Sequence, residues 1–94
     1  MIIKYTEHLK RRLKFRNIPT NYPKEIYLNP EKRFYDITED RNISIKKLRY
    51  NGKIRNMMIA YDLRPKHIEI VTIHPITDGK IDNRLSSKRW IKNG

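Results

Sequence analysis

The sequence predicts an α+β domain in which helices pack on a four-stranded antiparallel β-sheet. Three observations support this class. The chain opens with a segment that has helix-capping residues at its start. From residue 33 onward, apolar and β-branched segments alternate with turn signals, which is typical of strands. The pair Asn51-Gly52 lies between two of these segments and is the strongest short signal for a β-hairpin.

Two helices are expected before the first strand. The first spans 6–17, because Thr6 can serve as the N-cap and Pro19 lies just beyond the end. The second is short and spans 23–28, with a proline in its first turn and an Asn-Pro pair after its end. We expect the N-terminal helix to cover the apolar face of the sheet.

Four strands joined by turns are expected after the helices, and they form an antiparallel meander. The last of them is almost entirely apolar or β-branched, which predicts a central position or cover on both faces. The segment 81–92 is interpreted as a short C-terminal helix or tail. The four strands are expected at 33–37, 43–50, 53–63 and 68–74.

Length and composition predict one domain. The 94 residues suffice for a single domain, 1–94, with a core at 3–76 and a basic C-terminal extension at 77–94. The chain contains no cysteine, which excludes disulfides and thiolate catalysis and fits a reducing cytoplasm. No apolar run approaches the roughly 18 residues of a spanning helix, so no membrane partner is expected.

A large positive charge is the strongest functional signal. Lys and Arg number 22 against 10 Asp and Glu, which gives a net charge of +12. Such an excess opposes compaction, and it favours a polyanionic partner because each neutralised phosphate releases counterions. RNA or DNA, an anionic membrane and an acidic protein are the candidate partners, and the membrane is the weakest of them. A general basic bias of the source proteome is the alternative.

One row of residues on the N-terminal helix carries the candidate site. At about 100° per residue, His8, Arg12 and Arg16 lie on one side of the helix, within its packed face. Two guanidinium groups can hold phosphate oxygens, and an imidazole can transfer a proton near neutral pH. The alternative is that both arginines extend to the solvent at the edge of this face or pair with an internal acid, while His8 only caps the core. The apolar anchors of this face are Leu9, Leu13 and Phe15, and the candidate acids are Asp36, Asp62 and Glu69.

His74 is the second candidate for proton transfer. It ends the last predicted strand, and alternation places it with Thr72 on the face that carries Ile68 and Ile70. RNA supplies its own nucleophile, the 2′-hydroxyl, so a base, an acid and cations around the charged phosphorane suffice for cleavage. His8 and His74 would exchange protons, and no metal or other cofactor is expected. An ordinary histidine at a strand end is the structural alternative.

Other residues are weaker candidates for contacts to nucleic acid. Arg55 and Tyr61 lie on one face of the third strand and could face the same anion, although core packing is the commoner role of a tyrosine. The carboxylates at 36–40 are expected to be solvated, and they lack the paired spacing of a metal site. Further candidates are Thr72 and the basic tail residues Lys88, Arg89 and Trp90.

Several short motifs carry a family resemblance. They are His8, Arg12 and Arg16 followed by Asn17-Ile18, then Glu25-Ile26 and Asn29-Pro30, Asp36, Ala60-Tyr61-Asp62, and the segment 70–75. Over about residues 3–76, this pattern resembles a family of small bacterial and phage domains that is grouped with the barnase–EndoU–colicin–RelE-like (BECR) nucleases. The family pattern has an aromatic or aliphatic residue in place of His74.

The resemblance implies a fold with helices on a four-stranded sheet, RNA as the target, catalysis without metal and, in many members, a toxin role. It carries four residues into the site, which are His8, Arg12, Arg16 and Thr72. The sequence therefore predicts a cytoplasmic, metal-independent endoribonuclease of the toxin type, with tRNA or mRNA as the target and an acidic antitoxin as a further partner.

Two alternatives stay open. One is a protein that binds RNA or single-stranded nucleic acid without chemistry, and its affinity would fall steeply with salt while the ligand stays intact. The other is an interaction protein whose basic surface docks an acidic partner.

Overall fold

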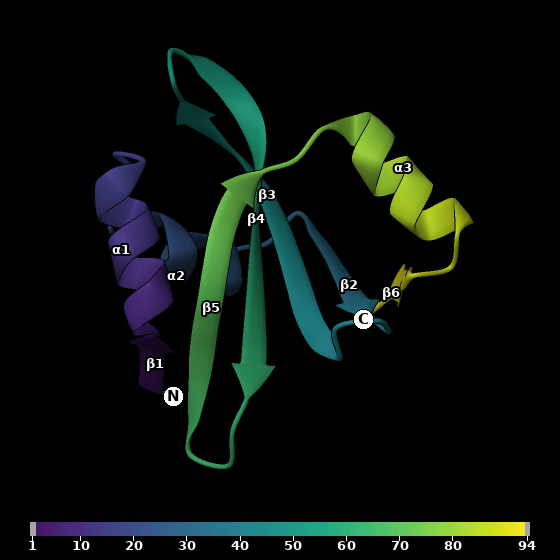
Figure 1. The fold of residues 1–94 in the computed structure, drawn as a ribbon, viewed down its shortest axis with the longest axis horizontal. Coiled ribbons are helices and arrows are strands. Elements are labelled where there is room, and N and C mark those ends of the chain that lie inside the picture. Colours follow the sequence, from purple (N-terminus) through teal and green to yellow (C-terminus); the bar gives the residue numbers. More distant parts are fainter. Residues whose placement is uncertain (1, 94) are drawn as a thin grey trace.

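The computed structural model describes residues 2–93, which form three helices and one six-stranded sheet (Figure 1). The strand order is β1-β5-β4-β3-β2-β6. No helix in the described part of the chain is long and apolar enough to cross a membrane. In chain order the elements are β1 (Ile2–Tyr5), α1 (Glu7–Phe15), α2 (Tyr22–Leu28), β2 (Lys32–Asp36), β3 (Arg41–Tyr50), β4 (Lys53–Leu63), β5 (His67–Pro75), α3 (Asp78–Ser86) and β6 (Trp90–Lys92).

The four central strands, β2 to β5, follow one another in an antiparallel meander. The strand predicted at 53–63 is β4, and the strand predicted at 68–74 lies within β5. Asn51 and Gly52 both have positive φ angles, 51° and 81°, as a two-residue hairpin of type I′ requires. Gly52 adopts this backbone without the steric cost of a Cβ atom. The β-hairpin predicted at Asn51-Gly52 is therefore confirmed as the β3–β4 hairpin.

The prediction of a four-stranded antiparallel sheet is wrong, because two short edge strands extend the sheet and one of them is parallel. β1 pairs in parallel with β5, with Ile3 opposite Ile68. β6 pairs antiparallel with β2, with Lys92 opposite Phe34. The added strands have four and three residues, too few for alternation to show. Each exists because a partner distant in sequence offers an open edge.

The segment predicted as a helix or tail over 81–92 divides into a helix and a strand. The Thr77 hydroxyl accepts a hydrogen bond from the Lys80 N–H at 3.2 Å, which caps α3 before residue 81. Lys88 has a φ of 62°, and this left-handed residue turns the chain out of the helix before β6 begins. Ile81 and Trp90 are each 2% exposed, so the C-terminal segment packs firmly against the sheet.

Alternate residues of the sheet supply two apolar clusters on opposite faces. Met57 and Ile59 of β4 pack with α1 and α2, whereas Met58 and Ala60 belong to the cluster that includes α3. The cluster under α1 and α2 consists of Leu9, Leu13, Ile18, Ile26, Tyr50, Met57, Ile59, Tyr61, Ile68, Ile70 and Ile73. The cluster under α3 consists of Phe34, Ile43, Ile45, Met58, Ala60, Ile76, Ile81 and Trp90.

Thr6 joins the start of α1 to the middle of β5. Its hydroxyl accepts a hydrogen bond from the Leu9 N–H at 3.1 Å, which confirms the predicted N-cap. The same hydroxyl donates to the Val71 carbonyl at 3.2 Å, and the Thr6 N–H donates to the Ile70 carbonyl at 3.1 Å. One residue thus satisfies two carbonyls of β5 where the ladder between β4 and β5 is interrupted.

We expect Thr6→Val to lower the free energy of unfolding by about 1–2 kcal/mol, because it keeps the side-chain shape but removes the cap and the bond to β5. Urea denaturation followed by circular dichroism measures this loss. Thr6→Ser keeps the hydroxyl and is the matched control, with a clearly smaller loss expected. Equal losses in the two variants would show that the hydroxyl contributes nothing.

Candidate functional site

A β-bulge in β5 decides which face of the sheet carries His74. In the pairing with β4, Thr72 and Ile70 are opposite the consecutive residues 60–61, so Val71 is an extra residue on β5. Ile70 stays in the cluster under α1, whereas Thr72 and His74 face the α3 side. The prediction that alternation keeps all of them on one face is wrong, because one extra residue reverses the alternation.

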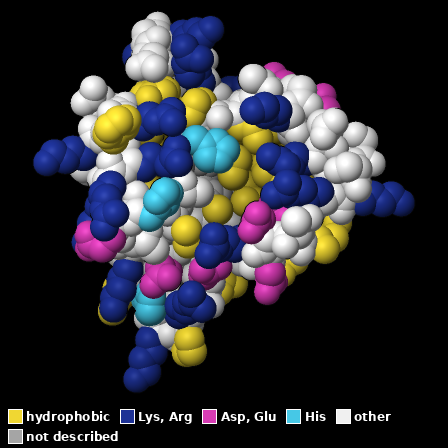
Figure 2. Space-filling view, viewed as in Figure 1, with side chains coloured by type: hydrophobic (Ala, Val, Ile, Leu, Met, Phe, Trp, Pro, Cys, Tyr) yellow, Lys and Arg dark blue, Asp and Glu magenta, His cyan; other side chains and the backbone are white. Residues whose placement is uncertain are grey.

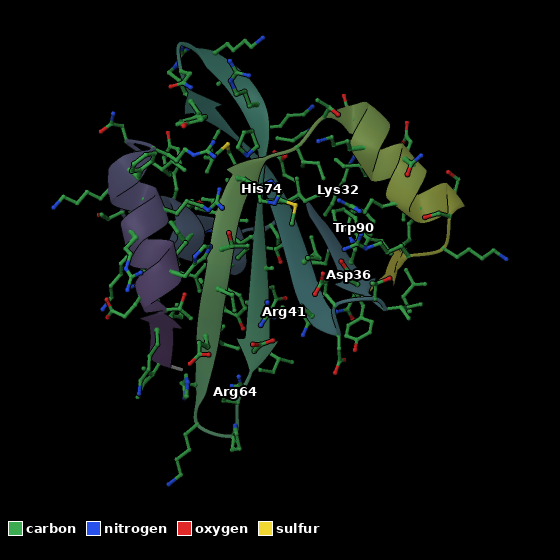
Figure 3. All side chains as sticks on the ribbon, in the orientation of Figure 1. Lys32, Asp36, Arg41, Arg64, His74 and Trp90 are labelled. Atoms are coloured by element: carbon green, nitrogen blue, oxygen red, sulfur yellow. The ribbon has the colours of Figure 1, made fainter. Side chains whose placement is uncertain are left out.

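A cleft of about 260 Å³ lies over this second face, between β5 and the C-terminal segment. Figure 3 shows His74 near the end of β5, with Asp36 and Trp90 across the sheet on β2 and β6. Figure 2 shows hydrophobic surface between a histidine and a group of Lys and Arg side chains on this face. The apolar floor includes Ile43, Met58 and Ala60. The polar and charged residues that line the cleft are Asp36, Glu39, Arg41, Thr72, His74, Arg84 and Arg89.

The His74 ring is oriented by the backbone. Its Nδ1 lies 3.0 Å from the carbonyl oxygen of Pro75. Because a carbonyl can only accept a hydrogen bond, Nδ1 carries the proton in the neutral ring. Nε2 then has the free lone pair, and it is the atom that can take a proton from a substrate.

Burial and three cations lower the pKa of His74 below its ordinary value of 6.5. Burial is the largest cause, and the positive charges of Arg12, Lys80 and Arg84 add to it, while the hydrogen bond to Pro75 opposes it. The ring is therefore neutral at pH 7. Arg12 comes from α1 and the other two cations come from α3, so His74 lies within the combined field of both helices.

Two of these cations have unsatisfied hydrogen-bond donors. The Nε atoms of Arg12 and Arg84 are buried and have no hydrogen-bond partner within the described residues. The guanidinium carbon of Arg84 lies 5.6 Å from the centroid of the Trp90 ring, a cation–π contact that holds the side chain in place. Buried donors without partners are costly. An anion in the cleft could form a charge-assisted hydrogen bond with Arg84, which lines it, and would interact with the charge of Arg12.

Asp36 lines the cleft, and its carboxylate is hydrogen-bonded to neighbouring residues of the protein. It is 3% exposed, so the prediction that it is solvated is wrong. Its carboxylate accepts hydrogen bonds from Trp90 Nε1 at 3.0 Å, Arg89 Nε at 3.3 Å and the Glu39 N–H at 3.0 Å. Burial alone would raise the pKa of Asp36, but these donors outweigh burial and lower the pKa below its ordinary value of 3.8. Asp36 is therefore ionised and neutralises Arg89.

The predicted alternative, in which the arginines of α1 pair with an internal acid, does not occur within residues 2–93. Asp62 pairs instead with Arg41 and Arg64, at 3.4 Å each. Glu69 pairs with Arg64 at 3.5 Å. Figure 3 shows Arg64 at the end of the sheet opposite to His74, and Arg41, which lines the cleft, between them in this view. The acids thus neutralise a different set of arginines and leave the charge of the α1 arginines uncompensated.

The three predicted residues of α1 occupy different environments. Arg12 is half-buried and acts on His74, whereas His8 and Arg16 are exposed. The structure shows no contact between His8 and His74 within the described residues. Of the predicted row, only Arg12 therefore acts on His74, through its charge. Arg12 lines a neighbouring hollow on α1 rather than the cleft, and His8 lies one helical turn before it.

The packed face of α1 is narrower than predicted. Leu9 and Leu13 are 0% and 3% exposed, as expected for anchors, but Phe15 is 87% exposed. Ile18, 5% exposed, takes the place expected for Phe15. The reason is the end of the helix, where Asn17 adopts a φ of 53° and turns the chain back toward the sheet. The prediction of Phe15 as an anchor is therefore wrong.

The other predicted contacts from the strands are spread over the molecule. Thr72 lines the cleft. Arg55 lies near the β3–β4 hairpin, where its Nε donates to the Tyr50 carbonyl at 2.9 Å. Tyr61 is 5% exposed and packs edge-to-face on Tyr27, with ring centroids 5.1 Å apart. Arg55 and Tyr61 therefore do not share an anion site with His74.

Of the three predicted tail residues, Arg89 and Trp90 contact Asp36 and Lys88 does not. Lys88 is exposed in the turn after α3. Arg89 pairs with Asp36, with Nη2 at 3.2 Å. Trp90 is 2% exposed and stacks on Phe34, with ring centroids 5.4 Å apart. Trp90 thus holds the core together and presents no free ring face to a base.

Sequence reasoning missed Lys80 and Arg84, the two cations that α3 brings to His74. They are four residues apart and so lie on one side of the helix. A signal for the start of this helix was available in the sequence, because Thr77 can serve as an N-cap and Asp78 is an acid in the first turn. The burial of Asp36 had no comparable local signal, because it depends on a residue 54 positions away.

The function of the cleft is inferred from its geometry. No protein-family model, no curated protein and no solved structure matches the chain. The resemblance to the BECR nucleases therefore remains a prediction. Within residues 2–93, no group of three or more His, Cys, Asp or Glu side chains is placed to hold a metal ion.

We expect NMR titration of the free protein to give a His74 pKa below 6.5, and inorganic phosphate in the cleft to raise it, because a nearby anion favours the imidazolium. Since the pKa is lower in the folded state, the free energy of unfolding declines as the pH falls from about 6.5 toward the folded pKa.

Arg12→Gln removes one of the positive charges that act on His74, so it should raise the pKa of His74 in the free protein. The matched control is Lys66→Gln, which removes an exposed cation in the turn between β4 and β5. A His74 pKa at or above 6.5, or equal shifts in the two variants, would contradict this description of the cleft.

Proposed function

We propose that the protein binds RNA by holding a backbone phosphate in the cleft beside His74. The observation that carries this proposal is the buried, unpartnered Nε of Arg84, which lines the cleft with His74. The Nε of Arg12 is also buried without a partner, and the charge of Arg12 acts on the same imidazole. A phosphate offers several acceptor oxygens and a negative charge, so one group can satisfy both guanidinium ions.

The charge of the whole chain supports a polyanion over a single small anion. The net charge of +12 exceeds what one phosphate would neutralise. Lys and Arg side chains also spread over the face that contains the cleft (Figure 2). Each further phosphate contact releases counterions and adds affinity that depends on salt. A chain of phosphates that crosses this face is therefore the partner that fits best, with tRNA or mRNA as the specific candidates.

We expect Arg12→Gln and Arg84→Gln each to weaken binding of a fluorescently labelled RNA about tenfold or more, as for the loss of a charged hydrogen bond of ~1.5 kcal/mol. Fluorescence anisotropy over a series of salt concentrations measures both the dissociation constant and its salt slope. The slope should decrease by about one for each cation removed from a phosphate.

Lys66→Gln serves as the control for charge alone, since Lys66 is exposed and does not line the cleft. Circular dichroism and thermal unfolding establish that each variant folds. If Lys66→Gln weakens binding as much as the two arginine variants, the cleft is not the phosphate site.

A second candidate function is cleavage of the bound RNA without metal, and the protonation state of His74 favours it. Neutral Nε2 can remove the proton of the 2′-hydroxyl. The 2′-oxygen then attacks phosphorus and the bond to the 5′-oxygen breaks, which gives a 2′,3′-cyclic phosphate and a 5′-hydroxyl. Arg12 and Arg84 would stabilise the negative charge of the phosphorane. His8, one turn from Arg12 on α1, is the candidate acid that protonates the leaving oxygen.

We expect RNA cleavage to proceed in excess EDTA and to fall by about 10²–10⁴-fold in His74→Ala, the range for loss of a general base. Below pH 6.5 the rate should decrease as His74 becomes protonated. An RNA with a single 2′-deoxy residue at the scissile position is the control, and it should be bound but not cut. Cleavage of that substrate, or a fully active His74→Ala variant, would leave RNA binding alone as the function.

The cellular setting follows from this proposal. We place the protein in the cytoplasm, where RNA targets occur and where a chain without cysteine is at no disadvantage. A toxin role would require an acidic antitoxin, and such a protein would compete with RNA for the same cationic face.

A further inference from the structure

Phe15 is an exposed aromatic ring among cations at the end of α1. It is 87% exposed, more than the other large apolar side chains on the surface. It lines a shallow hollow of about 530 Å³, and every other residue of this hollow is a histidine or a cation, namely His8, Arg11, Arg12, Lys14 and Arg16. Single exposed apolar residues are common on protein surfaces. An exposed aromatic ring surrounded by cations combines a surface for stacking with charges that attract an anion.

The core does not account for this position. Leu9, Leu13 and Ile18 already anchor the region of α1 to the sheet, with exposures of 0%, 3% and 5%. The Phe15 ring lies outside that cluster. Its removal would therefore leave the packing of α1 intact, which separates a binding role from a structural one.

A nucleotide with an unpaired base fits both chemical features of the hollow, the aromatic ring and the cations around it. A base has a flat π-face that stacks on an aromatic ring, and stacking of this kind tolerates any sequence. The phosphates on either side of the base carry the charges that the surrounding Arg and Lys side chains attract. In a duplex the bases are stacked and paired inside, so the ring would find no base face to contact.

Arg12 connects this hollow to the cleft. It lines the hollow beside Phe15, and its charge acts on His74 across β5. A strand whose base stacks on Phe15 can therefore present a neighbouring phosphate to Arg12 and the cleft without leaving the surface.

We propose that Phe15 is a base-stacking platform that restricts the RNA ligand to single-stranded or unpaired segments. This inference rests on the proposed RNA binding and adds the class of RNA. An acidic protein or a second copy of the chain would use the ring as an apolar contact without any need for a base.

The test compares binding of single-stranded and double-stranded RNA of the same length by the parent, Phe15→Ala, Phe15→Leu and Phe15→Trp. We expect Phe15→Ala to weaken single-strand binding about 5- to 100-fold, with duplex binding and the salt slope unchanged. Phe15→Leu keeps the apolar surface without the π-face and should resemble Phe15→Ala. Phe15→Trp should bind at least as well as the parent, and stacking on RNA should quench its exposed indole.

Leu28→Ala is the matched control, because Leu28 is also an exposed apolar residue at a helix end, 55% exposed on α2, and it does not line the hollow. Its binding should equal that of the parent. Thermal unfolding of each variant checks that the fold is retained.

Three results would overturn the stacking proposal while leaving RNA binding in place. They are unchanged single-strand binding in Phe15→Ala, equal losses for single strand and duplex, and full binding by Phe15→Leu. A parent protein that binds neither RNA would overturn the proposed function as well. Binding that is lost in Arg84→Gln but kept in Phe15→Ala would confine the ligand contact to the cleft, because Arg84 lines the cleft and not the hollow.

Discussion

The bulge at Val71 is the constraint on which the candidate site depends. Without it, strand alternation would carry Thr72 and His74 into the apolar cluster under α1. The bulge leaves Ile70 in that cluster and places His74 on the opposite face of the sheet, where it lines the cleft on the α3 side. Thr6 donates hydrogen bonds to the carbonyls of Ile70 and Val71, so the start of α1 is attached to β5 at the bulge.

The electrostatics of the site follow from where the few acids lie. Asp36 and Asp62 are each engaged by nearby arginines of the sheet or the C-terminal segment. Arg12, Lys80 and Arg84 then act on His74, and no carboxylate is among the charges that shift its pKa. Burial of unpaired guanidinium donors is unfavourable in the absence of an anion. We interpret the unpaired donors as lowering the stability of the free protein and raising its affinity for an anion, since an anionic ligand would supply the missing hydrogen-bond acceptors.

The cleft and the hollow on α1 are complementary in chemistry. The cleft offers guanidinium groups and a neutral imidazole, which suit a phosphodiester, whereas the hollow offers an aromatic ring. Arg12 lines the hollow and its charge acts on His74, so this one residue links the two surfaces. The proposed ligand, a strand with alternating phosphates and bases, would use both surfaces in the same binding mode.

The sequence by itself determined what depends on neighbours along the chain. The Thr6 cap, the Asn51-Gly52 hairpin and the extent of β4 were all predictable, because capping bonds and turn backbones involve residues a few positions apart. Only the tertiary structure decided the edge strands, the burial of Asp36 and the bulge at Val71. The edge strands and the burial of Asp36 require partners tens of residues away, and such pairings leave no periodic signal in the segments that form them. The bulge depends on the register between β4 and β5, which local alternation does not reveal, and Val71 bonds there to Thr6, 65 positions away.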